Sequence, residues 1–268
     1  MPVGVDPFLT VARAAGGRVG AVLLAPGGDE VASLDPDGVY IAASVIKLPL
    51  LMTLYADAAD GALSLEERLA VGERVDGSGV LRDLRDVGDM SLRDLAALAV
   101  TVSDNTATNR LIERIGPARV NERLEGWGCS RTRLRRAMYD LAGKARGLEN
   151  EMTPRETASL LARVAREAAA GDPAMTAVLG LLGRNTNALR LGRYLPDGVT
   201  LAHKDGWIDG VDNDAGIVTA RASAVAAGFT AGIPPRVARP LLGRLGLAAA
   251  EVAGADVDAA WIAAAAGA

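Results

Sequence analysis

A serine and a lysine stand three residues apart, at Ser44 and Lys47, where apolar spacing predicts the start of a helix. Side chains three positions apart lie on neighbouring turns, so the hydroxyl and the amine can meet. A serine hydroxyl needs a base to remove its proton, and a lysine desolvated among leucines can be partly neutral. The pair is suited to nucleophilic attack, although the same spacing alone also describes a helix start with a solvated lysine.

The triplet Ser103-Asp104-Asn105 lies between two stretches of helical periodicity. A turn at this point can send alternate side chains in opposite directions. We expect Asp104 to cap a helix or hold the loop from inside, and Ser103 and Asn105 to face a shared cleft. There they would supply a proton-relay hydroxyl and an amide that recognises substrate.

A third polar group, Lys204-Asp205-Gly206, ends the predicted strand TLAHK. A glycine here lets a ligand approach the backbone closely, although a charge beside a glycine often marks only a turn. The three patterns occur in one order, each in the secondary structure that its role requires. Together they predict one catalytic cleft.

The rarity of cysteine and histidine narrows the chemistry. One cysteine, Cys129, and one histidine, His203, exclude an internal disulfide, a multi-thiolate metal site and a paired-histidine metal site. We interpret Cys129 as a packed thiol, and His203 as structural because strand neighbours point to opposite faces. The general base is therefore expected to be a lysine or a carboxylate, with no metal or organic cofactor.

Composition limits the partners. Half of the 268 residues are hydrophobic, 23% are charged, and the net charge is −4 with basic and acidic residues interspersed. Neither a basic face for nucleic acid nor an apolar stretch long enough for a membrane is visible. We expect a small-molecule substrate and a cytoplasmic protein, or a secreted or periplasmic one if a leader has been removed.

The elements that must position these residues change along the chain. Helical spacing at 7–15 precedes a predicted hairpin of RVGAVLLA and VASLDP, with Gly27 and Gly28 in its turn. Helical repeats then follow, and strands return at VTLAHKDG, AGIVTAR and SAVAAGFT. Further helices are expected at about 234–246 and 256–267.

This order predicts a single α/β (α+β) catalytic domain over residues 1–268. An antiparallel sheet of about five strands, flanked by terminal helices, would come from about 1–43 and 190–268. An all-helical part would come from about 44–189. The active site would lie at the seam between the two parts.

The three motifs resemble the S-x-x-K, S-D-N and K-T-G set of class A β-lactamases and penicillin-binding proteins. SDNTATNRLIERIG, MTPRETA and VDNDAGIV also resemble segments of that family, and the resemblance covers roughly residues 15–245. It implies the β-lactamase/transpeptidase-like fold and an active-site serine that acts on an amide or β-lactam.

Carried over residue by residue, the resemblance implies that Ser44 is acylated, that Lys47 activates it and that Ser103 relays a proton to the departing amine. Lys204 would bind the substrate's carboxylate, and it would also bias Lys47 towards its neutral form by like-charge repulsion. The resemblance implies that the substrate is bound by Asn105, Lys204, Asp205 and Gly206. It also implies an oxyanion hole formed by the backbone amides of Ser44 and Trp207.

Two departures from the family bear on function. Asp205 replaces the usual hydroxyl residue, and an anion repels a substrate carboxylate unless Lys204 neutralises it, so either Asp205 points away or the substrate is not a conventional anionic β-lactam. In the segment where the family carries an E-x-x-x-N loop, Met138 falls at the glutamate's place and Ala142 at the asparagine's. A thioether cannot accept a proton from water.

Acylation is therefore expected to be competent, and deacylation to be slow or to use another route. The candidate bases are Asp140, two positions after the missing glutamate, and Lys47, and a non-water acceptor is the other alternative. Glu149 and Glu151, at the end of the loop, would need a different path to the site.

The leading hypothesis is β-lactamase-like amide hydrolysis through an acyl-enzyme on Ser44. One alternative is a carboxypeptidase, esterase or acyltransferase that acts on a peptide or metabolite. A second alternative is a non-catalytic ligand binder or sensor.

Overall fold

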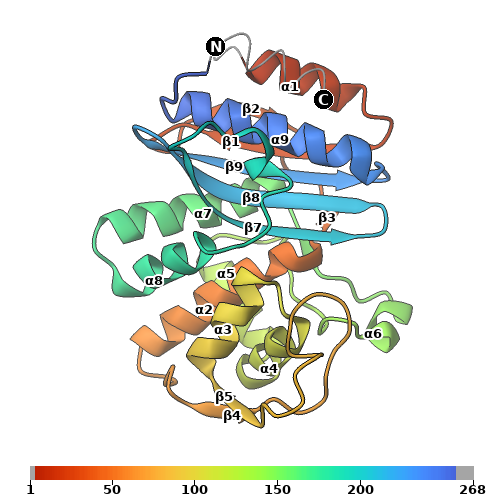
Figure 1. Cartoon of the computed structure of the whole chain (residues 1–268), viewed down its shortest axis with the longest axis vertical. Helices are drawn as coiled ribbons and strands as arrows, with labels where there is room; N and C mark the ends of the chain where they lie inside the picture. Colours follow the sequence, from red (N-terminus) through yellow and green to blue (C-terminus); the bar gives the residue numbers. More distant parts are fainter. Residues whose placement is uncertain (1–3, 258–268) are drawn as a thin grey trace.

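A five-stranded antiparallel sheet forms the centre of the fold in the computed structural model, which describes residues 4–257 (Figure 1). Its order is β2-β1-β9-β8-β7, so the amino-terminal hairpin lies beside three late strands, as the sequence predicts. The strands are β1 (Arg18–Leu24), β2 (Glu30–Leu34), β7 (Thr200–Ile208), β8 (Val211–Thr219) and β9 (Ser223–Ala231). Gly27 and Gly28 in the first hairpin have φ of 100° and 101°, a backbone region open to glycine.

Helices cover both faces of this sheet. The terminal helices α1 (Val5–Arg13) and α9 (Pro235–Val252) pack together on one face, and α7 (Pro154–Ala169) packs on the other (Figure 1). The predicted helices at 7–15 and 234–246 are thus confirmed, although α9 runs further than expected. The helix expected at 256–267 lies outside the described residues from position 258 onward.

The chain between β2 and β7 is mainly helical. Besides α7, its helices are η1 (Ala43–Ile46), α2 (Lys47–Ala59), α3 (Leu92–Thr101), α4 (Asn105–Ile115), α5 (Pro117–Gly126), α6 (Leu141–Ala145), α8 (Pro173–Leu182) and η2 (Leu191–Tyr194). Four short strands that the sequence did not predict pair across it, β3 (Tyr40–Ile41) with β6 (Glu151–Met152) and β4 (Arg68–Ala70) with β5 (Asp89–Ser91). Within residues 4–257, none of the helices is both long and apolar enough to cross a membrane.

One hydrophobic core joins the sheet to these helices. Val22 and Phe229 of the sheet belong to the same buried cluster as Leu50 of α2 and Leu95 of α3. Each fully buried aliphatic or aromatic side chain of this kind contributes about 1.5–3 kcal/mol. The continuous packing holds η1 and the start of α2 rigidly against β7, where the polar motifs meet.

Candidate active site

A cleft of about 800 Å³ lies at the seam between η1 and β7. The loop before α3, the start of α4 and the loop around α6 complete its walls. The predicted site residues that line it are Ser44, Ser103, Asn105, Asp205, Gly206 and Trp207. Lys47 and Lys204 are instead buried, with exposed fractions of 1% and 0%.

Backbone strain gathers at this cleft. Four non-glycine residues of the described chain have positive φ, and three of them line the cleft: Ala43 (47°), Ser103 (56°) and Tyr139 (60°). Such conformations cost of order 1–3 kcal/mol each and persist where surrounding packing imposes them. Ala43 directly precedes Ser44, so the strained turn fixes the direction in which the serine enters η1.

The amine of Lys47 links the first two motifs. Lys47 Nζ lies 2.7 Å from the carbonyl oxygen of Ser103, 3.1 Å from Ser103 Oγ and 2.9 Å from Asn105 Oδ1. Within residues 4–257 its hydrogen bonds therefore go to the second motif rather than to Ser44, which the sequence analysis expected as its partner. All three acceptors are uncharged.

This environment changes the protonation of the lysine. Burial lowers the pKa of Lys47 well below its usual 10.5, and the positive charge of Lys204 lowers this pKa further. Asp104 and Asp205 act in the opposite direction but do not reverse the shift. A lysine with a depressed pKa can hold a neutral amine and accept a proton.

Asp104 organises the loop around this amine. Its side chain caps α4 through the amide of Ala107, at 2.9 Å, and accepts hydrogen bonds from the amides of Val80 and Leu81 at 2.7 and 2.8 Å. A Cβ on Gly79 would lie 2.3 Å from Asp104 Oδ2, and Gly79 has a φ of 112°, so only glycine fits. The predicted structural role of Asp104 is confirmed.

Gly206 brings β7 against the start of η1. A Cβ at this position would lie 2.5 Å from the backbone nitrogen of Ser44 and 2.9 Å from that of Val45. Any other residue would therefore displace the strand from the serine. The close approach sets the backbone of β7, an edge strand, beside the amide of Ser44.

Lys204 and Asp205 belong to a buried ion-pair network. The prediction that the strand ends at Lys204 is wrong, because β7 stays paired with β8 as far as Ile208. Lys204 Nζ donates to the carbonyl oxygen of Asp205 at 2.7 Å and lies 3.2 Å from its Oδ1. Arg190 donates to Asp205 Oδ2 at 2.9 Å and also pairs with Asp212. Burial acts to raise the pKa of Asp205, but Lys204 and Arg190 outweigh burial and lower this pKa to about 2.

The loop at residues 137–149 is closed at its neck by Asn150. Asn150 Oδ1 accepts from the amides of Arg135 and Arg136 at 2.8 and 3.1 Å, and its amide group donates to the carbonyl oxygen of Arg136. The Arg136 guanidinium pairs with Glu149, and both side chains line the cleft. Glu149 thus reaches the cleft, which the sequence analysis did not foresee.

The loop places the two other candidates differently. Met138 lines the cleft and packs partly against the core, at the place where the sequence analysis put the missing glutamate. Asp140 caps α6 by accepting a hydrogen bond from the amide of Gly143 at 2.7 Å, and it is not among the residues that line the cleft. This capping role argues against Asp140 as a base that acts on water.

Two other predicted structural residues lie in the interior. His203 Nδ1 is 2.8 Å from Asp214 Oδ1, and its side chain is 2% exposed. Burial and the nearby Glu156 raise the pKa of the Cys129 thiol to about 12. Neither residue lines the cleft.

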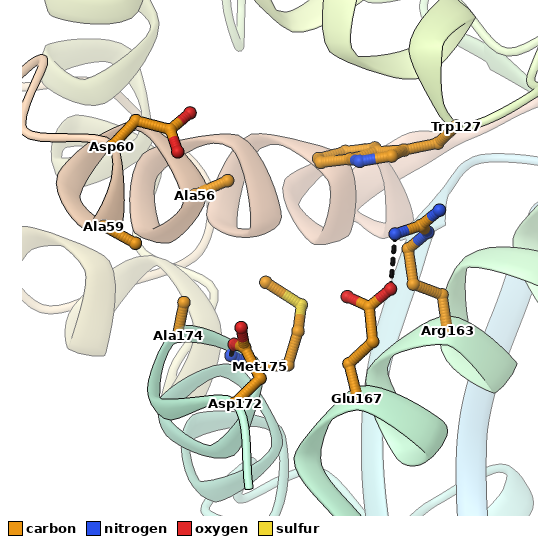
Figure 2. A pocket seen from close by; sticks show the side chains of 9 residues that line it. All are labelled: Ala56, Ala59, Asp60, Trp127, Arg163, Glu167, Asp172, Ala174 and Met175. Atoms are coloured by element: carbon orange, nitrogen blue, oxygen red, sulfur yellow. Dashed lines mark hydrogen bonds and ion pairs between the residues drawn. The ribbon is translucent and has the colours of Figure 1, made fainter. Parts of the chain in front are cut away.

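A second, smaller cavity of about 180 Å³ lies apart from these motifs, between α2, α7 and α8 (Figure 2). Figure 2 shows Trp127 at one side, with the Arg163–Glu167 ion pair facing Asp172 and Met175. None of the motif residues lines it.

The sequence did not indicate the roles of Arg190 and of the side-chain amides of Asn185 and Asn187. All three contact Asp205, and nothing in their local sequence pattern predicts this contact.

The fold and the site together define a class. An antiparallel sheet backed by terminal helices, joined to a helical part at a cleft that holds Ser44, Ser103 and Asn105, is the β-lactamase-like architecture. The sequence model of the Beta-lactamase enzyme family matches residues 7–253, and the chain belongs to this family.

Solved structures agree with this assignment. The β-lactamase from Sphaerobacter thermophilus DSM 20745 is 33% identical, with a TM-score of 0.86 over 95% of this chain and 98% of that one. A point mutant of PBP-A, solved as an acyl-enzyme complex with penicillin G, is 27% identical, with a TM-score of 0.80 over 91% of this chain and 93% of that one.

A regulatory protein is also similar. The β-lactamase regulatory protein BlaB of Streptomyces cacaoi is 32% identical over 120 residues, which are 43% of this chain. The match spans only 38% of the length of BlaB.

Proposed function

We propose that the chain is a serine hydrolase that forms an acyl-enzyme on Ser44 from an amide or β-lactam. Ser44 Oγ attacks the carbonyl carbon, an O–C bond forms, and the C–N bond breaks. The proton of Ser44 passes to the amine of Lys47 and then, through the hydroxyl of Ser103, to the departing nitrogen. The products of this step are the ester on Ser44 and the free, neutral amine.

The observation that carries the proposal is the environment of Lys47. Its amine is buried, its pKa is depressed, and it lies 3.1 Å from the hydroxyl of Ser103, which lines the same cleft as Ser44. A base must be neutral at the working pH and connected to the leaving group. A solvated lysine would meet neither condition.

The oxyanion would be held by two backbone amides, those of Ser44 and Trp207. The absence of a side chain at Gly206 supports this role, since β7 comes within contact of the Ser44 amide. Donors already in place where negative charge develops are worth about 10²–10³ in rate. Asn105, whose amide nitrogen now donates to the carbonyl oxygen of Asp76 at 2.8 Å, would bind the substrate's amide.

Deacylation is proposed to be slow. Met138 lines the cleft, and its thioether cannot remove a proton from water. The resemblance aligns Met138 with the family's water-activating glutamate. Lys47, Glu149 or a non-water acceptor would then complete the cycle. The PBP-A mutant was captured as an acyl-enzyme with penicillin G, which supports the use of a β-lactam as a probe of Ser44 here.

Intact-mass spectrometry after mixing the protein with a chromogenic cephalosporin tests the proposal. We expect one adduct that accumulates faster than product is released, and no adduct in Ser44→Ala. Rapid turnover without an accumulating adduct would contradict slow deacylation. A wild-type protein that neither gains mass nor releases chromophore, with the cephalosporin as its free acid and as its neutral ester, would contradict the acyl-enzyme itself.

Two alternatives have particular support. Met138 and Asp205 favour a carboxypeptidase, esterase or acyltransferase over a β-lactamase, and substrate profiling separates these activities. The similarity to BlaB, a protein described as regulatory, favours a ligand-binding sensor. A sensor that binds reversibly would keep its affinity in Ser44→Ala, whereas the proposed enzyme loses turnover.

A further inference from the structure

The middle of β7 presents the carboxylate of Asp205 to the cleft and buries the amine of Lys204. Asp205 is among the residues that line the cleft, whereas Lys204 is not and is 0% exposed. Two hydrogen bonds of Lys204 Nζ go back to Asp205, one to its carbonyl oxygen and one to Oδ1. Lys204, the cation that could attract a substrate carboxylate, is therefore buried, and its charge is compensated by Asp205.

The next cation behind this strand is also compensated. Arg190 is 0% exposed, and its guanidinium pairs with Asp205 Oδ2 at 2.9 Å and with Asp212. On its other side Asp212 lies 3.4 Å from Arg239 Nε. Neither arginine of this network is part of the cleft lining, so neither is available to a ligand there.

Asp205 is fixed in place by its own partners. Asn187 Nδ2 donates to Oδ2 at 2.7 Å and Asn185 Nδ2 donates to Oδ1 at 3.1 Å, in addition to Arg190 and Lys204. A carboxylate with donors on both oxygens cannot rotate away without leaving buried groups unpaired. A substrate carboxylate brought against β7 would face the fixed carboxylate of Asp205. The cations beside it, Lys204 and Arg190, are already paired with Asp205.

The other charged side chains that line the cleft either lie away from β7 or carry the same negative charge as Asp205. Asp209, in the turn after β7, adds a second carboxylate to the lining. Arg136 is paired with Glu149, and the remaining lining cations, Arg82 and Lys144, come from the loop before α3 and from α6. The β7 side of the cleft is therefore the side that opposes an anion.

The rim of the cleft is apolar. Five of its lining side chains are large, hydrophobic and exposed: Ile41 (37%), Tyr139 (55%), Leu141 (71%), Trp207 (57%) and Ile208 (39%). One comes from β3, two from the loop around α6 and two from the end of β7. Exposed apolar side chains gathered at a cleft gain free energy when an apolar ligand covers them.

We propose that Asp205 is a specificity-determining residue, and that the Ser44 site takes an uncharged ester or amide with an apolar group and rejects substrates that bring a carboxylate to β7. This inference rests on the proposed acylation of Ser44. It adds the substrate class: the acyl donor is neutral where it runs along β7, and its apolar part lies against Trp207 and Ile208.

A matched pair of probes tests the inference without any mutation. One chromogenic cephalosporin is used as the free acid and as its methyl ester, and the rate of mass gain at Ser44 is measured for each. We expect the ester to acylate about tenfold faster or more, because like charges opposed in a desolvated site cost more than a tenfold change in equilibrium. Faster acylation by the free acid would overturn the inference.

Variants at position 205 assign the preference to this residue. Asp205→Asn and Asp205→Thr should each shift the acid-to-ester rate ratio about tenfold towards the acid. Asp197→Asn removes the same charge from an exposed loop before β7 and should leave the ratio unchanged. Folding of each variant is checked by its thermal transition, and the wild-type ratio stands as a test if a variant does not fold.

The outcomes separate the two proposals. The specificity inference is wrong if Ser44 is acylated faster by the acid than by the ester, or if the acid-to-ester rate ratio is unchanged in folded Asp205→Asn. Either result leaves the proposed acyl-enzyme intact. Absence of any adduct with both probes overturns the acyl-enzyme and the inference with it.

Discussion

Two lysines of this chain, Lys47 and Lys204, are buried behind different walls of one cleft, but their neighbours differ. Lys47 donates to a carbonyl, a hydroxyl and an amide, all of them uncharged. Lys204 donates to Asp205, whose carboxylate also pairs with Arg190. The chain has three lysines in all, and its other basic residues besides His203 are arginines, which hold their protons.

The difference shows how burial can serve chemistry or structure. An amine that is desolvated without a counterion is held in a state from which it readily gives up its proton. An amine that is desolvated beside a carboxylate has its charge compensated, and the pair becomes part of the scaffold. The same residue type is therefore suited to accept a proton on the helical wall and to hold a structural ion pair on the sheet wall.

Of the changes that test this difference between the two lysines, removal of the Lys47 amine should have the largest effect. Lys47→Met should slow acylation of Ser44 by about 10²–10⁴-fold, because general-base assistance is lost. The rate of mass gain with a chromogenic cephalosporin measures this effect. Acylation at the wild-type rate in a folded Lys47→Met protein would show that another group removes the proton.

The pH dependence of the wild-type protein follows from the same residue. The acylation rate should rise with pH and level off well below pH 10.5, because the folded-state pKa of Lys47 is lowered from that value. In the window between the two pKa values the unfolded chain binds more protons at this site, so Lys47 makes the free energy of unfolding increase with pH. Lys47→Met should lose both dependences.

Disrupting the ion-pair network around Asp205 should lower the free energy of unfolding rather than the rate of acylation. Arg190→Met leaves Asp205 and Asp212 as buried carboxylates with one cation fewer, and we expect a loss of about 3–5 kcal/mol in the free energy of unfolding. Urea denaturation measures this loss. A loss below about 1 kcal/mol would mean that Arg239 and Lys204 suffice to compensate both carboxylates.

The loop offers a smaller gain of function. Met138→Glu places a carboxylate where the cleft lacks a water-activating group, and deacylation should become about 10²-fold faster. Decay of the Ser44 adduct by intact mass measures the rate, with Met138→Gln as the control of similar size that has no base. Equal decay in the two variants would mean that position 138 does not reach the hydrolytic water.

An exposed ion pair should show the smallest effect. Arg68 and Asp89 pair across β4 and β5 with side chains more than half exposed. Arg68→Met should leave the free energy of unfolding nearly unchanged, because solvent screens both charges. This variant is the surface counterpart of Arg190→Met, and a comparable loss in both would contradict the special cost of the buried network.

Much of the fold was predictable from local pattern. The hairpin glycines, the three late strands and the helix-capping Asp104 are all confirmed, because each depends on residues close together in the sequence. The short pairs β3–β6 and β4–β5 were not predicted. Their two or three residues pair with segments far away in the chain, and so brief a strand has no periodicity of its own.

The sequence by itself determined which polar groups this protein has and roughly which element carries each: Ser44 and Lys47 at a helix start, Ser103 and Asn105 at a turn, and Lys204 on a strand. Only the tertiary structure decided what surrounds them. It put Arg190, Asn185 and Asn187 around Asp205, and gave Lys47 its partners in Ser103 and Asn105. Charge state and access depend on desolvation and on neighbours brought from distant segments, and these exist only once the core has closed.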